Sequence, residues 1–177
     1  PNSVYAIDDL NLDWFPEDPL LYPSASHEIF SQDNLIFVAG GGTDFFHDEI
    51  LVSEIGASGV LLGWTIKSKL PQPVVWHTIV QNGNDIYILG GKTESSPLDS
   101  VYYTTLGPDG NLSGWIPLKP LPQPLGLGRA VIYNNRIYYF GGTVNSQPQQ
   151  TVYSANINPD VTIDDWQLLP SLPESRS

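Results

Sequence analysis

The sequence contains no cysteine and no methionine among its 177 residues. Without cysteine it can form no disulfide framework, no thiolate zinc site and no cysteine nucleophile. Residue 1 is proline, and methionine is absent even there, so we expect the chain to be a processed or excised piece of a longer product.

Basic residues are also few, with 7 lysines and arginines against 19 aspartates and glutamates, which gives a formal net charge of −12. Such a chain repels a phosphate backbone, and its basic residues are scattered along the sequence, so we expect no nucleic-acid partner. The longest apolar stretches, such as residues 59–66, are far shorter than the roughly 20 residues of a membrane-spanning helix. We therefore expect no membrane insertion.

Charged residues make up only 15% of the chain, whereas it contains 16 glycines and 16 prolines. This composition is typical of many turns and few solvated helices, and it predicts an all-β protein. The hydrophobic fraction of 41% is enough for a core and argues against disorder. A cysteine-free, acidic, turn-rich chain favours a secreted or extracytoplasmic location and does not exclude the cytoplasm.

Several short motifs recur in one phase, every 50 or 51 residues. Four tryptophans share this spacing, and glycine pairs in the same phase each close an apolar run. A Leu-Pro step and a Val-Tyr pair also recur in phase. The markers are Trp14, Trp64, Trp115 and Trp166; Gly40-Gly41, Gly90-Gly91 and Gly141-Gly142; Leu70-Pro71, Leu121-Pro122 and Leu172-Pro173; and Val101-Tyr102 and Val152-Tyr153. A fixed period of this length is the signature of a repeat architecture.

One period, residues 75–117, predicts four short strands. A turn at 82–85, rich in residues that tolerate positive φ, joins the first two strands, and a second turn at 107–110 precedes the last. The expected strands are 76–81, 86–89, 101–105 and a run around Trp115. Such an antiparallel sheet has no helix to cover either face, so its copies must bury one another, which radial stacking into a β-propeller achieves.

These residues resemble the kelch repeat, which has a period of about fifty, a glycine pair ending its second strand, a Val-Tyr in its third and a tryptophan in its fourth. The resemblance covers essentially the whole chain and implies kelch-type blades of four antiparallel strands. It departs at the polar positions after the Leu-Pro step. The family's histidine is present as His27 and His77 but is Gly128 in the third copy.

The repeat phase divides the chain into about three and a half blades. We expect part of a six- or seven-bladed ring, because propellers of this kind resemble closed rings. The expected units are a half blade at 1–18, blades at 19–69, 70–120 and 121–169, and the start of the next blade at 170–177. The expected partners are therefore the remaining blades or a second copy of the chain, and we favour a piece of a longer chain over a natural homodimer.

The loops that follow the three glycine pairs share almost nothing in sequence, so we interpret them as a ligand-specific surface on a constant scaffold. The candidate binding residues on these loops are Phe45, Phe46, His47, Asp48, Lys92, Glu94, Asn145 and Gln147. The acidic side chains beside His47 offer oxygen ligands, but their spacing matches no defined metal motif, so we predict no metal site. Gly90-Gly91-Lys92-Thr93 imitates a phosphate loop without its first glycine or its helix, so we expect no cofactor.

Three further candidates are expected near the central face of the ring: His27, His77 and Arg129. Either histidine could act as a general base if a carboxylate such as Glu28 oriented it. Their repetition favours a structural role instead. Arg129 could bind an acidic ligand.

The sequence thus leaves three functional interpretations, and the fold alone does not choose among them. The favoured one is a non-catalytic binding or scaffold module of kelch type, which presents variable loops to a protein or glycan partner. The alternative is a sugar-active enzyme similar to the sialate mutarotases that share this fold; galactose oxidase is excluded because its cofactor needs a cysteine-linked tyrosine. The third is a half-propeller with no activity of its own.

Overall fold

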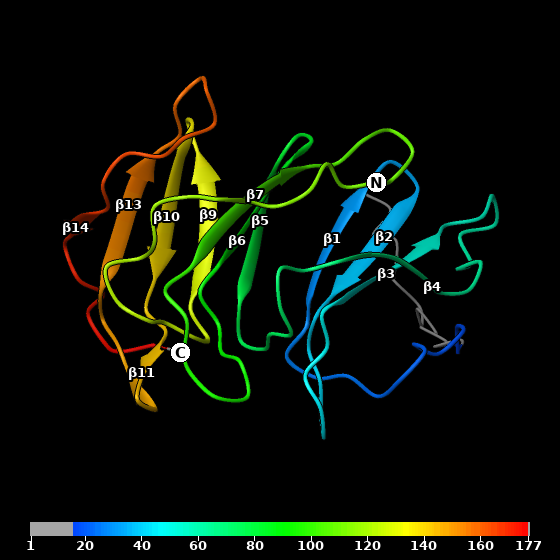
Figure 1. The fold of residues 1–177 in the computed structure, drawn as a ribbon, viewed down its shortest axis with the longest axis horizontal. Helices are drawn as coiled ribbons and strands as arrows, with labels where there is room; N and C mark the ends of the chain where they lie inside the picture. Colours follow the sequence, from blue (N-terminus) through cyan, green and yellow to red (C-terminus); the bar gives the residue numbers. More distant parts are fainter. Residues whose placement is uncertain (1–15, 177) are drawn as a thin grey trace, which may run out of the picture.

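The computed structural model describes residues 16–176, which form three four-stranded antiparallel sheets that stand side by side (Figure 1). Within this range no residue is helical and no helix is long and apolar enough to cross a membrane. The first sheet comprises β1 (Glu28–Gln32), β2 (Leu35–Ala39), β3 (Glu49–Glu54) and β4 (Thr65–Lys69). The second comprises β5 (Thr78–Asn82), β6 (Asp85–Leu89), β7 (Val101–Thr105) and β8 (Ile116–Pro117).

The third sheet comprises β9 (Arg129–Tyr133), β10 (Arg136–Phe140), β13 (Val152–Asn156) and β14 (Gln167–Leu169). In each sheet the strands pair in chain order. The third differs because its second and third strands are joined through a separate hairpin, β11 (Thr143–Val144) with β12 (Gln147–Pro148). The sequence did not predict this hairpin.

Each of the three sheets lies inside one of the units expected from the repeat phase, 19–69, 70–120 and 121–169. The half blade expected at 1–18 falls almost entirely outside the described residues. At the other end, Arg176 forms an isolated bridge with Gln149, in the loop between β12 and β13. The exact unit boundaries stay a prediction.

Tight turns set the strand pairing at one end of every sheet. β5 and β6 turn at Gly83-Asn84, with φ of 61° at Gly83, and β9 and β10 turn at Asn134 and Asn135, with φ of 49° and 53°. Glycine and asparagine adopt positive φ at low cost, which suits a two-residue hairpin. The turn predicted at 82–85 is confirmed.

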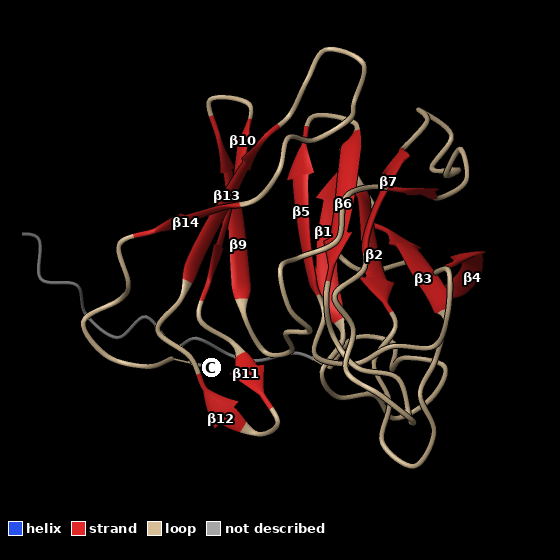
Figure 2. Ribbon diagram, turned by 60° about the vertical axis from the view of Figure 1, so that its left-hand side comes forward, coloured by secondary structure: helices blue, strands red, loops and turns tan. Residues whose placement is uncertain are grey.

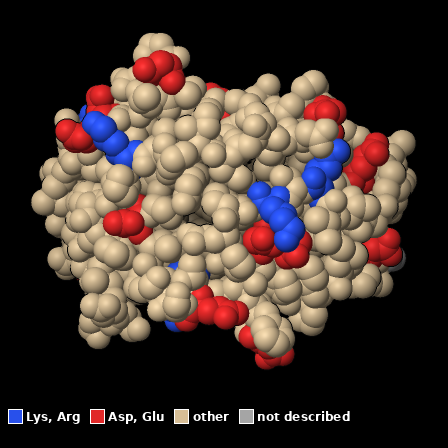
Figure 3. Space-filling view, viewed as in Figure 1, with Lys and Arg blue, Asp and Glu red and all other residues tan. Residues whose placement is uncertain are grey.

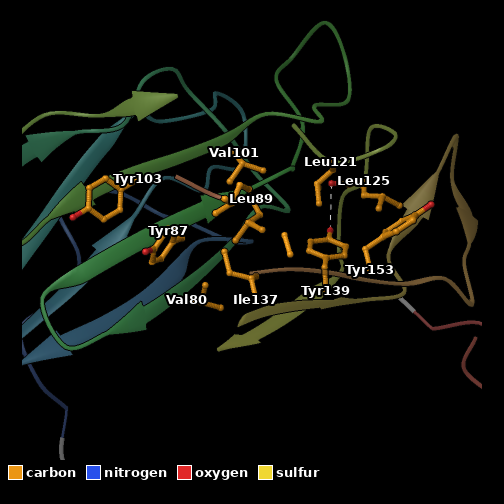
Figure 4. Close-up of a cluster of buried hydrophobic side chains, with 12 residues drawn as sticks. Val80, Tyr87, Leu89, Val101, Tyr103, Leu121, Leu125, Ile137, Tyr139 and Tyr153 are labelled. Atoms are coloured by element: carbon orange, nitrogen blue, oxygen red, sulfur yellow. Dashed lines mark hydrogen bonds between the residues drawn. The ribbon is translucent and has the colours of Figure 1, made fainter. Parts of the chain in front are cut away.

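Side chains of β6 alternate between two cores, because successive residues of a strand point to opposite faces of its sheet. Ile86 and Ile88 belong to the apolar cluster shared with the first sheet. Tyr87 and Leu89 belong to the cluster shared with the third sheet, where they lie near Ile137 (Figure 4). The middle sheet is therefore covered on both faces, which explains its almost unbroken apolar run. The first strands of the sheets, β1, β5 and β9, are in contact in that order (Figure 2).

The glycine pairs bind each repeat to the next. The second glycine of each pair donates its N–H to a main-chain carbonyl at the start of the following repeat: Gly41 to Val74 at 2.9 Å, Gly91 to Leu125 at 2.8 Å and Gly142 to Arg176 at 2.9 Å. All six glycines of the three pairs have positive φ. At each glycine pair the main chains of two neighbouring repeats are in direct contact, which a side chain would prevent. The glycine pair therefore does more than end a strand, because it joins one repeat to the next.

The periodic tryptophans form a second set of joints. The indole Nε1–H of Trp64 donates to the carbonyl of Asp18 at 3.1 Å, that of Trp115 to Lys69 at 2.8 Å and that of Trp166 to Lys119 at 3.2 Å. Each acceptor precedes its tryptophan by 46 or 47 residues and lies within one residue of the expected end of the preceding repeat unit. The fixed tryptophan spacing therefore reflects a bond between neighbouring repeats. Trp14 lies outside the described residues.

Replacing Trp115 by phenylalanine should lower the free energy of unfolding by about 1 kcal/mol, because phenylalanine keeps much of the apolar body but donates no hydrogen bond. Urea denaturation followed by circular dichroism measures this difference. Trp76→Phe is the control, since the Trp76 indole donates to no residue of the described chain. Equal losses in the two variants would show that the indole bond contributes nothing.

Candidate functional site

The variable loops gather at one end of the sheets, which we call the loop face. It comprises the loops 40–48, 90–100 and 141–151, together with the links 70–77 and 118–128 that join the sheets, and it forms the lower side of Figure 1. Isolated bridges join links to loops within it, Val75 to Lys92 and Gly126 to Thr143. The tight hairpin turns lie at the opposite end.

The first loop presents one aromatic side chain to solvent. Phe45 is 72% exposed, whereas Phe46 is half-buried. The backbone N–H of Phe46 donates to a carboxylate oxygen of Glu94 at 3.4 Å, which ties the first loop to the second. Phe45 is therefore the most prominent apolar contact that the loop face offers.

The polar residues that follow Phe46 contact three residues outside the loop, which are Tyr22, Glu49 and Lys69. The His47 ring stacks on Tyr22 with 3.8 Å between centroids, and its Nδ1 lies 3.4 Å from Glu49. Asp48 pairs with the Lys69 ammonium at 2.9 Å. Burial and, to a lesser degree, the Glu49 carboxylate raise the pKa of Tyr22 to about 12. Among the described residues no three metal-ligating side chains converge here or elsewhere.

The second and third loops bring two predicted residues together. Lys92 and Asn145 line one pocket of about 210 Å³, which also includes Trp76 from the preceding link. The two other predicted loop residues lie outside it: the Glu94 carboxylate accepts the Phe46 amide, and the Gln147 carbonyl accepts the Gln149 side-chain amide at 2.7 Å. Sequence reasoning missed Trp76, although its position out of phase with the periodic tryptophans was a usable signal.

The residues predicted near the central face include an ion pair of an exposed Arg129 with a half-buried Glu28, and a buried His77 ring. The Arg129 guanidinium, on β9, donates to the Glu28 carboxylate, on β1, at 2.8 Å. β5 contacts both of these strands. Burial raises the pKa of Glu28, an effect that Arg129 opposes. His77 is only 1% exposed, and neither ring nitrogen has a hydrogen-bond partner among the described residues. Burial lowers the pKa of His77 to about 4. His27 is half-buried.

The missing histidine of the third repeat has a steric explanation. A Cβ at Gly128 would overlap the phenol oxygen of Tyr139, which fills the space beside it. The Tyr139 hydroxyl donates to the carbonyl of Leu125 at 3.5 Å (Figure 4). Burial raises the pKa of Tyr139, so the phenol stays protonated. Gly128 is therefore the partner of a buried tyrosine and not a lost ligand.

The surface charge agrees with the composition. Lysines and arginines are few on the face that Figure 3 displays, and acidic side chains are scattered between them without forming one patch. Several basic groups are already paired, as Lys69 with Asp48 and Lys119 with Asp165. No basic patch forms on that face.

Comparisons with known proteins give modest but extended similarity. No family model matches the chain. It is 25% identical over 173 residues to Kelch-like protein 41b of Danio rerio, a match that covers 98% of this chain and 27% of that protein. It is 26% identical over 140 residues to Alpha-scruin of Limulus polyphemus, a match that covers 73% of this chain and 14% of that protein. The solved structure titled "Structure of YjhT" superposes with a TM-score of 0.69 at 16% identity, covering 88% of this chain and 58% of that one. The chain thus spans about a quarter or less of the length of the curated relatives it matches.

Proposed function

We propose that this chain, which is built of kelch-type β-propeller blades, is a non-catalytic binding or scaffold module whose loop face holds a protein or glycan partner. The kelch resemblance and the fold predicted from the sequence are confirmed by the relatives and by the solved structure. What stays a proposal is the use of the loop face.

One observation carries the proposal: the joints between repeats are constant, whereas the loops between them are not. Glycine N–H groups and indoles make the same main-chain bonds at every repeat. The loop face instead carries an exposed Phe45 on the first loop and an extra hairpin, β11 with β12, on the third. A rigid scaffold with divergent loops on one face supports recognition by those loops.

The sugar-active alternative would draw on Glu28, His77 and Arg129. Glu28 and Arg129 neutralise one another, and the third group is buried. A general base must lie within hydrogen-bond reach of the proton that it takes, and His77 is almost fully shielded from solvent. We therefore favour the binding module.

Site-specific photo-crosslinking tests the proposal. A benzophenone amino acid at position 45 should capture a defined partner from an extract of the source organism, and unlabelled protein should compete for it. The same label at Asn84, in the turn between β5 and β6 at the opposite end, should capture none. Phe45→Ala should weaken binding of the identified partner by about tenfold or more, as expected for an exposed aromatic anchor, whereas Asn84→Ala should not. The proposal would be contradicted if the labels at positions 45 and 84 captured the partner equally, or if Phe45→Ala bound the partner as tightly as wild type.

A further inference from the structure

We propose that the pocket beside Trp76 binds a single acidic sugar unit, a pyranose that carries one carboxylate, as a uronic acid does. The proposal rests on the proposed function, because the pocket belongs to the loop face. It is lined by residues of the links 70–77 and 118–128 and of the second and third loops: Trp76, Gly91, Lys92, Pro97, Gly126, Thr143, Asn145 and Ser146.

The backbone conformation at Trp76 recurs in every described repeat, but the indole side chain does not. The equivalent link residues are Ser26 and Leu127, and all three have nearly the same positive φ, 58°, 60° and 59°. The links bond to one another, with the Leu127 N–H donating to the Trp76 carbonyl at 2.8 Å. Positive φ costs a non-glycine residue about 1–2 kcal/mol and disfavours bulky side chains most. Since serine and leucine adopt the same conformation at the equivalent positions, the link does not require an indole, and the presence of tryptophan at position 76 needs another explanation.

The indole forms one wall of the pocket and is close to small residues that keep the space open. A Cβ at Gly126 would come within 3.4 Å of the Trp76 side chain, so a larger residue would begin to cover it. The pocket volume of about 210 Å³ suits one sugar ring rather than a folded peptide segment. The apolar C–H face of a pyranose packs on an aromatic surface, because both surfaces are apolar and rigid.

Lys92 gives the pocket its charge. Its ammonium lies 5.1 Å from the centroid of the Trp76 ring, and it forms no salt bridge with any described residue. Four other basic groups each contact a carboxylate: Lys69, Lys119, Arg129 and Arg176. An ammonium held over an aromatic ring, without an acidic partner, is a ready site for a ligand carboxylate.

The third loop supplies hydrogen-bonding groups for hydroxyls. Asn145 and Ser146 form the turn between β11 and β12, with φ of 48° and 63°, and both line the pocket. Their side chains make no hydrogen bond with other described residues. An amide and a hydroxyl can each donate and accept, which matches the hydroxyl groups of a sugar.

Charge favours a ligand with one carboxylate over an acidic peptide. Glu94 stands two residues from Lys92 on the same loop, and the chain as a whole carries a net charge of −12. A peptide with several carboxylates would be repelled by this field, whereas a single carboxylate can meet the single ammonium. A neutral sugar would leave the ammonium without its counter-charge.

Calorimetric titration with methyl β-D-glucuronide and methyl β-D-glucoside tests the proposal. We expect the glucuronide to bind at least tenfold more tightly than the glucoside. Lys92→Gln should remove most of that preference. Trp76→Leu, which installs the residue found at the equivalent position 127, should weaken the binding of both sugars at least tenfold. Lys67→Gln, on β4 and outside the loop face, changes the net charge by the same amount and should leave both affinities unchanged.

Three results would overturn the inference: no binding of either sugar, equal affinity for both, or a glucuronide affinity that Lys92→Gln leaves unchanged. Tighter binding of a diglutamate peptide that Lys92→Gln abolishes would also overturn it, in favour of a peptide site. Thermal unfolding of Trp76→Leu tests whether the variant is folded, and Lys92→Gln provides a second variant at a side chain that is only half-buried. If photo-crosslinking from position 45 still captures a partner, these failures concern this pocket alone and leave the proposed function standing.

Discussion

Gly90→Ala is expected to lower the free energy of unfolding by about 3 to 5 kcal/mol, a large part of the stability of a domain of this size. Gly90 has φ of 60°, and a Cβ there would overlap the carbonyl oxygen of Leu125. That carbonyl accepts the Gly91 N–H at 2.8 Å, so the substitution strains one backbone and disturbs the joint to the next sheet. Urea denaturation measures the loss.

Gly83→Ala separates the two causes. Gly83 has almost the same φ, 61°, but a Cβ there would meet no atom within 4 Å. We expect this variant to lose only the cost of positive φ, about 1–2 kcal/mol. If Gly90→Ala and Gly83→Ala lose equal amounts, the close approach to Leu125 is not what the glycine pair provides.

Acidification should destabilise the protein through His77. Burial holds the pKa of His77 in the folded protein at about 4, below its ordinary value of 6.5. Between these two pH values the unfolded chain binds a proton that the folded protein does not, so stability is highest above pH 6.5, falls as the pH drops, and stops falling from this cause below about 4. The total loss is about 3 kcal/mol.

His77→Leu checks this expectation, because leucine keeps an apolar volume in the site and cannot titrate. The difference in unfolding free energy between wild type and variant should change by about 3 kcal/mol from pH 7 to pH 4, in favour of the variant at low pH. Carboxylates that titrate in the same range act on both proteins and cancel in the difference. The His77 ring proton resonance should also titrate near pH 4. A pH-independent difference, with that resonance titrating near 6.5, would contradict the assignment.

The repeat architecture was predictable from the sequence because the repeated residues meet local main-chain requirements. The glycine pairs stand where the main chain has positive φ, and glycine and asparagine occupy the tight hairpin turns, where φ is also positive. The third strand of the second repeat was predicted at 101–105, and the observed β7 spans Val101–Thr105. The first strand was predicted at 76–81 but begins at Thr78, because the link residue Trp76 has positive φ and is not extended.

The candidate site was only partly predictable, because it depends on which repeats become neighbours. Lys92 and Asn145 were predicted on separate loops, and only the folded arrangement places them around Trp76. His27 and His77 occupy equivalent positions, yet His77 is buried and His27 only half-buried. Periodicity identifies equivalent positions, but their environments differ with the side chains of the adjoining repeat.

The joints between repeats also bear on how such chains change their length over evolution. Both the glycine N–H groups and the tryptophan indoles donate to main-chain carbonyls, at Val74, Leu125 and Lys119 among others. Every residue carries that acceptor, so a duplicated or exchanged repeat can be received by its new neighbour without a matched side-chain partner. Copying within a gene could therefore lengthen or shorten the array while the loops diversify independently.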